Sequence, residues 1–218
     1  MKKRAFALVL AALLLAGCNP DTPEPTPTAA DTQQRPGQAI GEGLVFVEYS
    51  SFSGAFPEDG SGRKVSGVAA MLIRNDSGRF LDHVLVDCKI GSSNGTFKVT
   101  GLAPKASVWV LEQSGRQITA EDTFHVTGIR DWAFRDTYTS ATDQLKVTTN
   151  NGMVTVQNLS ENPLHNVCIY YKNLHTDGNF FGGITYLLSF DALEPGQSLS
   201  KRSSHYGADS QIVRYSFQ

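Results

Sequence analysis

The sequence contains few cysteines, few charged residues and no long apolar run. Three cysteines among 218 residues are too few for a disulfide-stabilised scaffold, and their spacing is not that of a zinc site. Charged residues make up only 18% and the formal net charge is −2, so no basic surface for nucleic acid is expected. Because 40% of the residues are hydrophobic and 10% are aromatic, wholesale disorder is also excluded. What remains is an ordinary globular chain, long enough for one large domain or two smaller ones.

The first seventeen residues have the organisation of an export signal. Basic residues at positions 2–4 precede twelve apolar residues at 5–16, a run too short to span a bilayer. The run ends in the letters LAGC at 15–18. This box resembles the lipobox of bacterial lipoproteins, and the resemblance implies that a signal peptide of residues 1–17 is removed and that Cys18 carries the lipid. A plain secretory signal with an unmodified Cys18 is the alternative.

A proline-rich segment follows the leader. Five of the nine prolines lie between residues 19 and 40, so we expect a tether over residues 18–41. In extended polyproline geometry, about twenty residues at ~3.1 Å each reach up to about 60 Å. Removal of the leader leaves 16 Lys and Arg against 21 Asp and Glu, a net charge of −5, so the lipid would anchor the protein without a basic patch. The sequence thus predicts an extracytoplasmic protein that is lipid-anchored to the membrane of the bacterial cell envelope.

Short alternating apolar runs separated by turn residues predict an all-β fold without helices. In a first series we expect strands at 44–49, 65–73, 84–90, 96–100, 107–111 and 124–129. In a second series we expect them at 132–134, 145–149, 153–157, 167–172, 181–190, 198–201 and 211–217. Many short strands at this spacing are typical of β-sandwiches.

The two series repeat the same landmarks. Ile73-Arg74-Asn75 matches Val156-Gln157-Asn158, and the Leu-x-Pro turn at 102–104 matches the one at 193–195. A duplicated module therefore predicts two tandem domains. The pattern resembles bacterial immunoglobulin-like modules of the FxLYD and cell-adhesion-related type, although the FxLYD tetrad itself is absent from both copies. In the second copy the pattern is carried by Val156, Asn158, Leu164, Val167, Asp177-Gly178, Leu193, Pro195, Gly196 and Ser198.

The resemblance implies two immunoglobulin-like β-sandwich domains, which we place at 42–127 and 128–218, and it implies no activity. The first copy departs from the pattern at Lys105, which replaces the glycine of the second copy. Strand parity predicts that Tyr170 and Lys172 point away from the second core. The outward set of the first copy is apolar, so we expect a strand, the other domain or a partner to cover it; it comprises Val68, Ala70, Leu72 and Leu85.

The sequence offers little catalytic chemistry. Residues 91–95 fit the G-x-S-x-G pattern, but a strand follows where a nucleophile elbow needs a helix, so we expect a hairpin turn. The five histidines are scattered, and the acidic turns at 58–62 and 177–179 lack the alternating ligands of a calcium loop. Cys88 and Cys168 fall in different domains and are not expected to form a disulfide. We therefore predict no enzyme activity, no catalytic residue, no metal and no cofactor.

The remaining hypothesis is a non-catalytic interaction or display module. Its partners would be the membrane, through the lipid on Cys18, and a protein or glycan of the envelope, but no nucleic acid. A carbohydrate-binding surface lipoprotein is the alternative, and an enzyme is a more distant one. Two segments, 50–63 and 173–183, are longer than the strands need and carry aromatic residues, which suit recognition. The candidate binding residues are Phe52, Phe56, Tyr170, Phe180 and Phe181, with Tyr170 expected to join Phe180 or Phe181; alternatively the phenylalanines close the ends of the cores.

Overall fold

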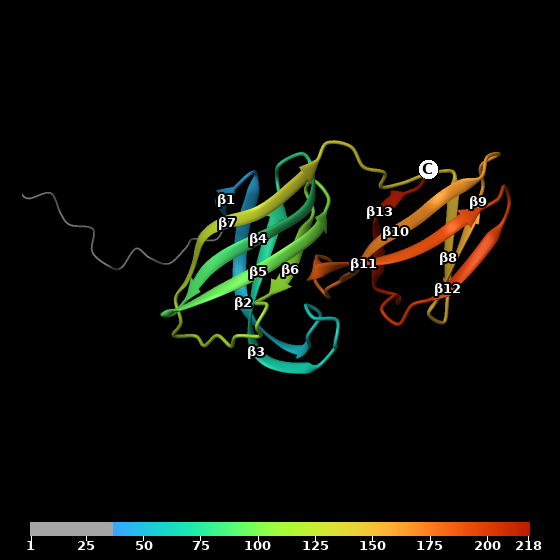
Figure 1. Ribbon diagram of the computed structural model, residues 1–218. Helices are drawn as coiled ribbons and strands as arrows, with labels where there is room; N and C mark the ends of the chain where they lie inside the picture. Colours follow the sequence, from blue (N-terminus) through green and yellow to red (C-terminus); the bar gives the residue numbers. More distant parts are fainter. Residues whose placement is uncertain (1–36) are drawn as a thin grey trace, which may run out of the picture. The chain divides into compact units, whose positions relative to one another are not determined.

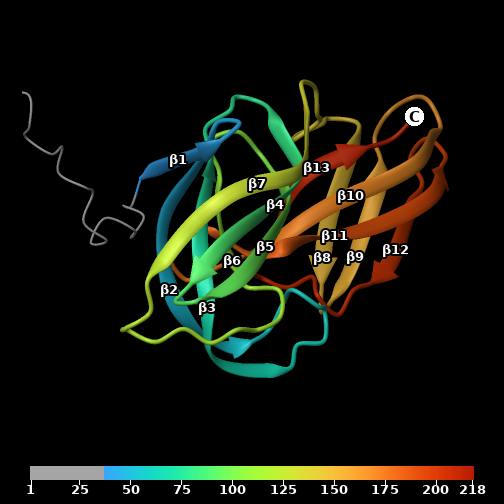
Figure 2. The same cartoon turned by 60° about the vertical axis from the view of Figure 1, so that its left-hand side comes forward.

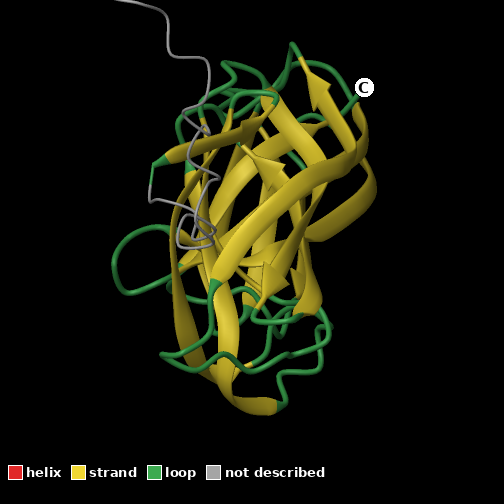
Figure 3. Ribbon diagram, turned by 90° about the vertical axis from the view of Figure 1, so that its left-hand side faces the viewer, coloured by secondary structure: helices red, strands yellow, loops and turns green. Residues whose placement is uncertain are grey.

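The computed structural model describes residues 37–218, so the predictions for the leader, for Cys18 and for most of the tether lie outside the described residues. Figure 3 shows that this part consists of strands and loops, and the predicted all-β fold is confirmed. Within the same range, no helix has the length and apolar character needed to cross a membrane.

The strands form two groups along the chain (Figure 1). The first group, here called the N-terminal sandwich, comprises β1 (Gln38–Gly41), β2 (Leu44–Ala55), β3 (Lys64–Asn75), β4 (Phe80–Ile90), β5 (Ser93–Leu102), β6 (Ser107–Leu111) and β7 (Phe124–Arg135). The second group, the C-terminal sandwich, comprises β8 (Leu145–Asn150), β9 (Met153–Asn158), β10 (Leu164–Leu174), β11 (Phe180–Leu193), β12 (Ser198–Arg202) and β13 (Ser210–Ser216).

Both groups have the same strand order. In the N-terminal sandwich β2-β3-β6 faces β5-β4-β7, and in the C-terminal sandwich β8-β9-β12 faces β11-β10-β13. Within each sandwich, all of these neighbours are antiparallel, and Figure 2 shows the two sets of layers. Alternate residues of the facing strands fill one apolar core in each sandwich, as the parity of the sequence predicts.

An equivalent buried asparagine holds one corner of each sandwich. Asn75 donates from Nδ2 to the carbonyls of Arg79 (2.8 Å) and Leu102 (2.9 Å), and its Oδ1 accepts from the backbone and hydroxyl of Ser77. Asn158 makes the same set of bonds in the C-terminal sandwich, with Nδ2 donating to the carbonyls of Asn162 (2.8 Å) and Leu193 (2.9 Å). The matching landmarks of the sequence therefore correspond to one repeated structural corner.

One sheet runs through both sandwiches. The start of β11 pairs in parallel with β6, which makes a seven-stranded sheet in the order β1-β2-β3-β6-β11-β10-β13. A small apolar cluster beside this pairing includes Val68 and Ala70 of the outward apolar set. Its buried members are Phe56, Val68, Ala70 and Leu111, and Phe52, Val65, Trp109 and Phe181 pack against them. Leu72 of the outward set is also buried, and Leu85 is half-buried.

Three expectations about boundaries differ from the structure. The predicted domain boundary at 127/128 lies inside β7, because the segment 128–135 continues to pair with β4. The segment 132–134, predicted as the first strand of the second copy, is therefore the end of a strand of the N-terminal sandwich. The predicted tether extends to residue 41, but Gln38–Gly41 already forms β1 against β2.

Candidate functional site

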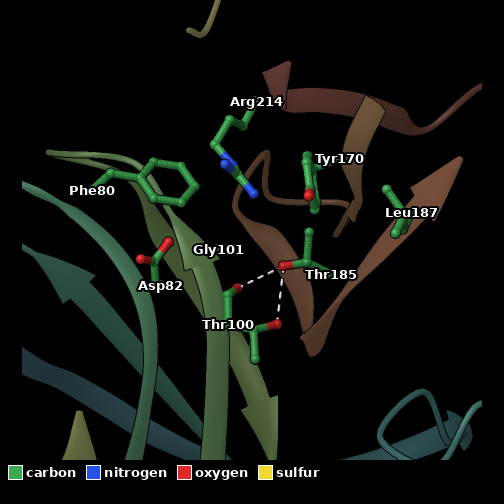
Figure 4. Close-up of a pocket in the computed structure, with 8 residues that line it drawn as sticks. All are labelled: Phe80, Asp82, Thr100, Gly101, Tyr170, Thr185, Leu187 and Arg214. Carbon is green, nitrogen blue, oxygen red and sulfur yellow. Dashed lines mark hydrogen bonds between the residues drawn. The ribbon is translucent and has the colours of Figure 1, made fainter. Parts of the chain in front are cut away.

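A cleft of about 280 Å³ opens where strands of both sandwiches approach each other. Figure 4 shows Phe80, Asp82, Thr100 and Gly101 on one side, and Tyr170, Thr185, Leu187 and Arg214 on the other. The first four belong to β4 and β5, and the others belong to β10, β11 and β13. Strands far apart in sequence therefore build this cleft together.

The floor of the cleft is a pair of mutually bonded threonines. The hydroxyl of Thr185 donates to the carbonyl of Thr100 (2.8 Å), and the Thr100 hydroxyl lies 3.0 Å from that of Thr185 (Figure 4). The Thr100 hydroxyl also donates to the Gly183 carbonyl (2.9 Å). Gly101 has a φ of 57°, and a Cβ there would collide with the Thr185 side chain. A glycine is thus required at 101 both for the backbone conformation and for the close approach of the two strands.

Arg214 projects into the cleft against an aromatic face. Its guanidinium carbon lies 3.8 Å from the centre of the Tyr170 ring and 5.9 Å from that of Phe80. No described residue forms a hydrogen bond or ion pair with this guanidinium. Stacking on the ring holds the planar cation in place while its N–H donors stay available.

The carboxylate in the cleft is already engaged. Asp82 accepts a hydrogen bond of 2.6 Å from Nε of Arg135, and this bond raises the pKa of Arg135. Arg135 and Arg214 also line a neighbouring hollow of about 290 Å³, whose other residues are Thr137, Tyr138, Thr139, Tyr215, Ser216 and Phe217. Arg214 thus lies between two hollows, and the carboxylate that lines one of them, Asp82, is bonded to Arg135.

A half-buried carboxylate of the N-terminal sandwich, Glu58, binds the start of β11. The carboxylate of Glu58 accepts from the backbone nitrogen of Leu111 (2.8 Å) and from that of Gly183 (2.9 and 3.0 Å). Burial raises the pKa of Glu58, while these hydrogen bonds and the nearby Lys172 oppose the increase. A Cβ at Gly183 would collide with the carbonyl of Lys98, so the strand can approach β5 this closely only as glycine.

Lys172 completes this junction from the C-terminal sandwich. Its ammonium group donates to the carbonyls of Gly182 (3.0 Å), Gly183 (3.4 Å) and Ile184 (2.7 Å), and the side chain is fully buried. Burial lowers the pKa of Lys172 to about 7, and the charge of Glu58 counteracts the decrease. Strand parity correctly directs this side chain away from the C-terminal core, and the junction covers it.

The structure distributes the five predicted binding residues over three places. Phe56 is fully buried in the small cluster beside β6, and Phe52 and Phe181 pack there with ring centres 4.9 Å apart. Phe180 packs against the N-terminal core. Tyr170 lines the cleft with Arg214, so it lies with neither phenylalanine in one cluster.

Arg214 was not singled out from the sequence. A lone arginine in the last strand carries no motif, and its position depends on the pairing of β13 with β10, which sets Arg214 beside Tyr170. The available signal was Tyr170 itself, an aromatic residue on the outward parity of a strand.

The residues considered for catalysis or metal binding form no such site in the part of the chain that the structure describes. The G-x-S-x-G segment forms the β4–β5 hairpin, with Ile90 paired to Ser93. Both described cysteines are free, and burial raises the pKa of the Cys88 thiol to about 12. In the part of the chain from residue 37 onward, no three His, Cys, Asp or Glu side chains gather in a way that could hold a metal ion.

The fold and the cleft define a class of protein: an all-β chain with two immunoglobulin-like sandwiches and an arginine-bearing cleft where they meet. A comparison with protein-family models found no match, and a search of curated proteins found none. The resemblances to bacterial lipoproteins and to FxLYD-type modules therefore rest on the residues quoted for them above.

Proposed function

We propose that this chain is a lipid-anchored, extracytoplasmic protein of the bacterial envelope whose folded body binds an envelope partner without catalysing a reaction. The observation that carries the proposal is the cleft between the sandwiches, in which the Arg214 guanidinium has free donors beside Tyr170. Clefts between domains with a few convergent polar groups are common ligand sites. The Thr185 hydroxyl and the Asp82 carboxylate are already hydrogen-bonded to Thr100 and Arg135. Neither group is therefore placed to exchange a proton with a ligand, which supports binding rather than catalysis.

The leader and the tether support the anchoring part of the proposal. A charged start, a short apolar run and a cysteine at position 18 occur in the order that lipid attachment needs, and a proline-rich stretch follows. We expect Cys18→Ala to release the protein from the membrane fraction or to leave it unprocessed. Unchanged processing together with unchanged membrane fractionation would contradict this part.

A glycan is the partner that the cleft favours over a protein. Tyr170 and the exposed Leu187 offer apolar surface, and Thr137, Thr139 and Ser216 line the adjoining hollow. Apolar side chains beside hydroxyl groups suit the apolar faces and hydroxyls of a sugar. The volume of the cleft, about 280 Å³, lies near the lower end of the range for small-ligand pockets, roughly 300–1,000 Å³.

Photo-cross-linking in cells tests the binding site directly. The position for the probe is Leu187, which lines the cleft and is 52% exposed, so Leu187→p-benzoylphenylalanine places a reactive group there without opening a core. The matched control is Thr148→p-benzoylphenylalanine, on the exposed face of β8 and outside the cleft. We expect a light-dependent adduct at position 187 and none of the same size at position 148. Adducts at neither position, or equal adducts at both, would refute the cleft as the binding site.

A further inference from the structure

The chemistry of Arg214 narrows the class of ligand, and this step rests on the proposed function of the cleft. A guanidinium carries five N–H donors in a planar fork that matches two oxygens of an anion. In Arg214 no described residue uses these donors, although the ring of Tyr170 fixes the plane of the group at 3.8 Å. The fork is therefore already oriented, and pairing it with a bidentate anion costs little side-chain entropy.

The charge balance of the cleft also calls for an anion. Asp82 is the acidic member of its lining and is bonded to Arg135 at 2.6 Å, which leaves the charge of Arg214 uncompensated. The mature chain as a whole is acidic, with 21 Asp and Glu against 16 Lys and Arg after residue 17. Because the net charge of the protein is negative, long-range electrostatics do not attract an anion, and an anionic ligand must be selected by its direct ion pair with Arg214.

The walls around Arg214 indicate what the anion is attached to. On one side lies the cleft of about 280 Å³ with Tyr170 and the exposed Leu187, and on the other lies the hollow with Thr137, Thr139 and Ser216. A ligand that spans both needs an apolar face, several hydroxyls and one carboxylate. We propose that the cleft binds a sugar that carries a carboxylate, a uronic acid residue of a glycan, and that Arg214 pairs with this carboxylate through two parallel hydrogen bonds.

Calorimetric titration of the detergent-solubilised mature chain tests this assignment. The probes are a trimer of galacturonate, the neutral trimer of galactose and galactose 6-phosphate. The variants are Arg214→Gln, which removes the charge and the fork, and Arg214→Lys, which keeps the charge alone. Arg202→Gln is the matched control, because Arg202 is an exposed arginine on β12 outside the cleft.

We expect the galacturonate trimer to bind and Arg214→Gln to weaken this binding by about tenfold or more, with Arg214→Lys intermediate and Arg202→Gln unchanged. We also expect the neutral trimer to bind more weakly by about tenfold or more. Equal binding of the neutral trimer, equal binding by a folded Arg214→Gln chain, or tighter binding of the phosphate would each overturn the assignment. Because Arg214→Lys and a thermal unfolding scan accompany Arg214→Gln, a folding defect is recognised as such.

The two proposals fail in different ways. An adduct at position 187 together with no binding of galacturonate would overturn the uronic acid and leave the cleft as the binding site. Binding of galacturonate that Arg214→Gln abolishes, together with no adduct at position 187, would show an anion site that no envelope partner occupies in the cell, and would overturn the proposed function instead.

Discussion

The substitution Glu58→Gln tests how the two sandwiches are held together. Glu58 and Lys172 contact the nitrogen and the carbonyl oxygen of the same residue, Gly183, from opposite sandwiches. Glutamine keeps one oxygen for the bonds that Oε1 of Glu58 accepts from Leu111 and Gly183, but it loses the negative charge and the second bond from Gly183 to Oε2. The lost hydrogen bond does not depend on the charge of Lys172, so the difference between two pH values isolates the electrostatic part of the junction.

The expected magnitude follows from the burial of both groups. Two unit charges about 5–8 Å apart at an effective dielectric constant of about 20 interact by about 2–3 kcal/mol. With Lys172 charged, removal of the Glu58 charge should lower the free energy of unfolding by that amount, because the pKa of Lys172, held at about 7, falls further. Once Lys172 is neutral in the folded state, the carboxylate has no partner charge and its burial is unfavourable, so Glu58→Gln should then cost nothing or stabilise the protein.

The assay is urea denaturation of the wild type and Glu58→Gln at about pH 6 and about pH 9, on either side of the pKa of Lys172. We expect the destabilisation to shrink by about 1 kcal/mol between these pH values, because about pH 6 is only about one unit below the pKa of Lys172 and the neutral form limits the loss there. The matched control is Asp59→Asn, the exposed neighbouring carboxylate paired with Arg63, which should have a small effect that does not change with pH in this window. A destabilisation by Glu58→Gln that stays constant or grows toward pH 9 would refute the reasoning.

Three further predictions concern single side chains. Lys172 has a folded pKa of about 7 against an ordinary 10.5, so the unfolded chain binds more protons than the folded chain between these two pH values. Stability should therefore rise with pH from about 7 to about 10.5, by up to about 5 kcal/mol. Lys172→Met should abolish this contribution in denaturation curves, and an unchanged rise would contradict the prediction. Asn158→Ala removes four hydrogen bonds at a buried corner and should cost about 2–4 kcal/mol, as should Asn75→Ala, whereas unequal losses measured in urea would argue against equivalent corners. Gly101→Ala places a Cβ against Thr185 at a φ of 57° and should cost more than about 2 kcal/mol, so a thermal midpoint within a degree or two of the wild type would show that β5 and β11 are not packed this closely.

The strands were predictable because their signals are local. Alternating apolar residues and turn residues set the bounds of β6 at Ser107–Leu111 as predicted, and they located the other strands except β1. The asparagine corners were predictable as a repeat, since the same bonds need the same residue types at the same spacing. Such features depend on neighbours in sequence or on a repeated motif.

The continuation of β7 was not predictable in this way. Its second half contains the charged residues Arg130 and Asp131, which interrupt the apolar alternation and indicate a break in the strand. In the structure Asp131 has a φ of 48°. Pairing with β4 nevertheless extends to Arg135 across several bulges. Tertiary pairing thus overrides the local signal, and the domain boundary predicted at 127/128 fell within the strand.

The candidate site was predictable only in part. The outward position of Tyr170 follows from strand parity, but its contact with Arg214 and the burial of Lys172 both depend on contacts between segments far apart in the chain. From the sequence alone, a lysine or an arginine such as Lys172 or Arg214 is expected to be exposed to solvent. Only the parallel pairing of β6 with β11 turns these positions into a junction and a cleft.

Competition at position 187 tests the central claim most directly. Isolated envelopes that carry the Leu187→p-benzoylphenylalanine chain would be irradiated with and without an excess of galacturonate trimer, with the neutral galactose trimer as control. The account predicts that galacturonate suppresses the adduct at position 187 and that the neutral trimer does not. An adduct that persists at full yield in saturating galacturonate would contradict the claim that the envelope partner occupies the cleft of Arg214.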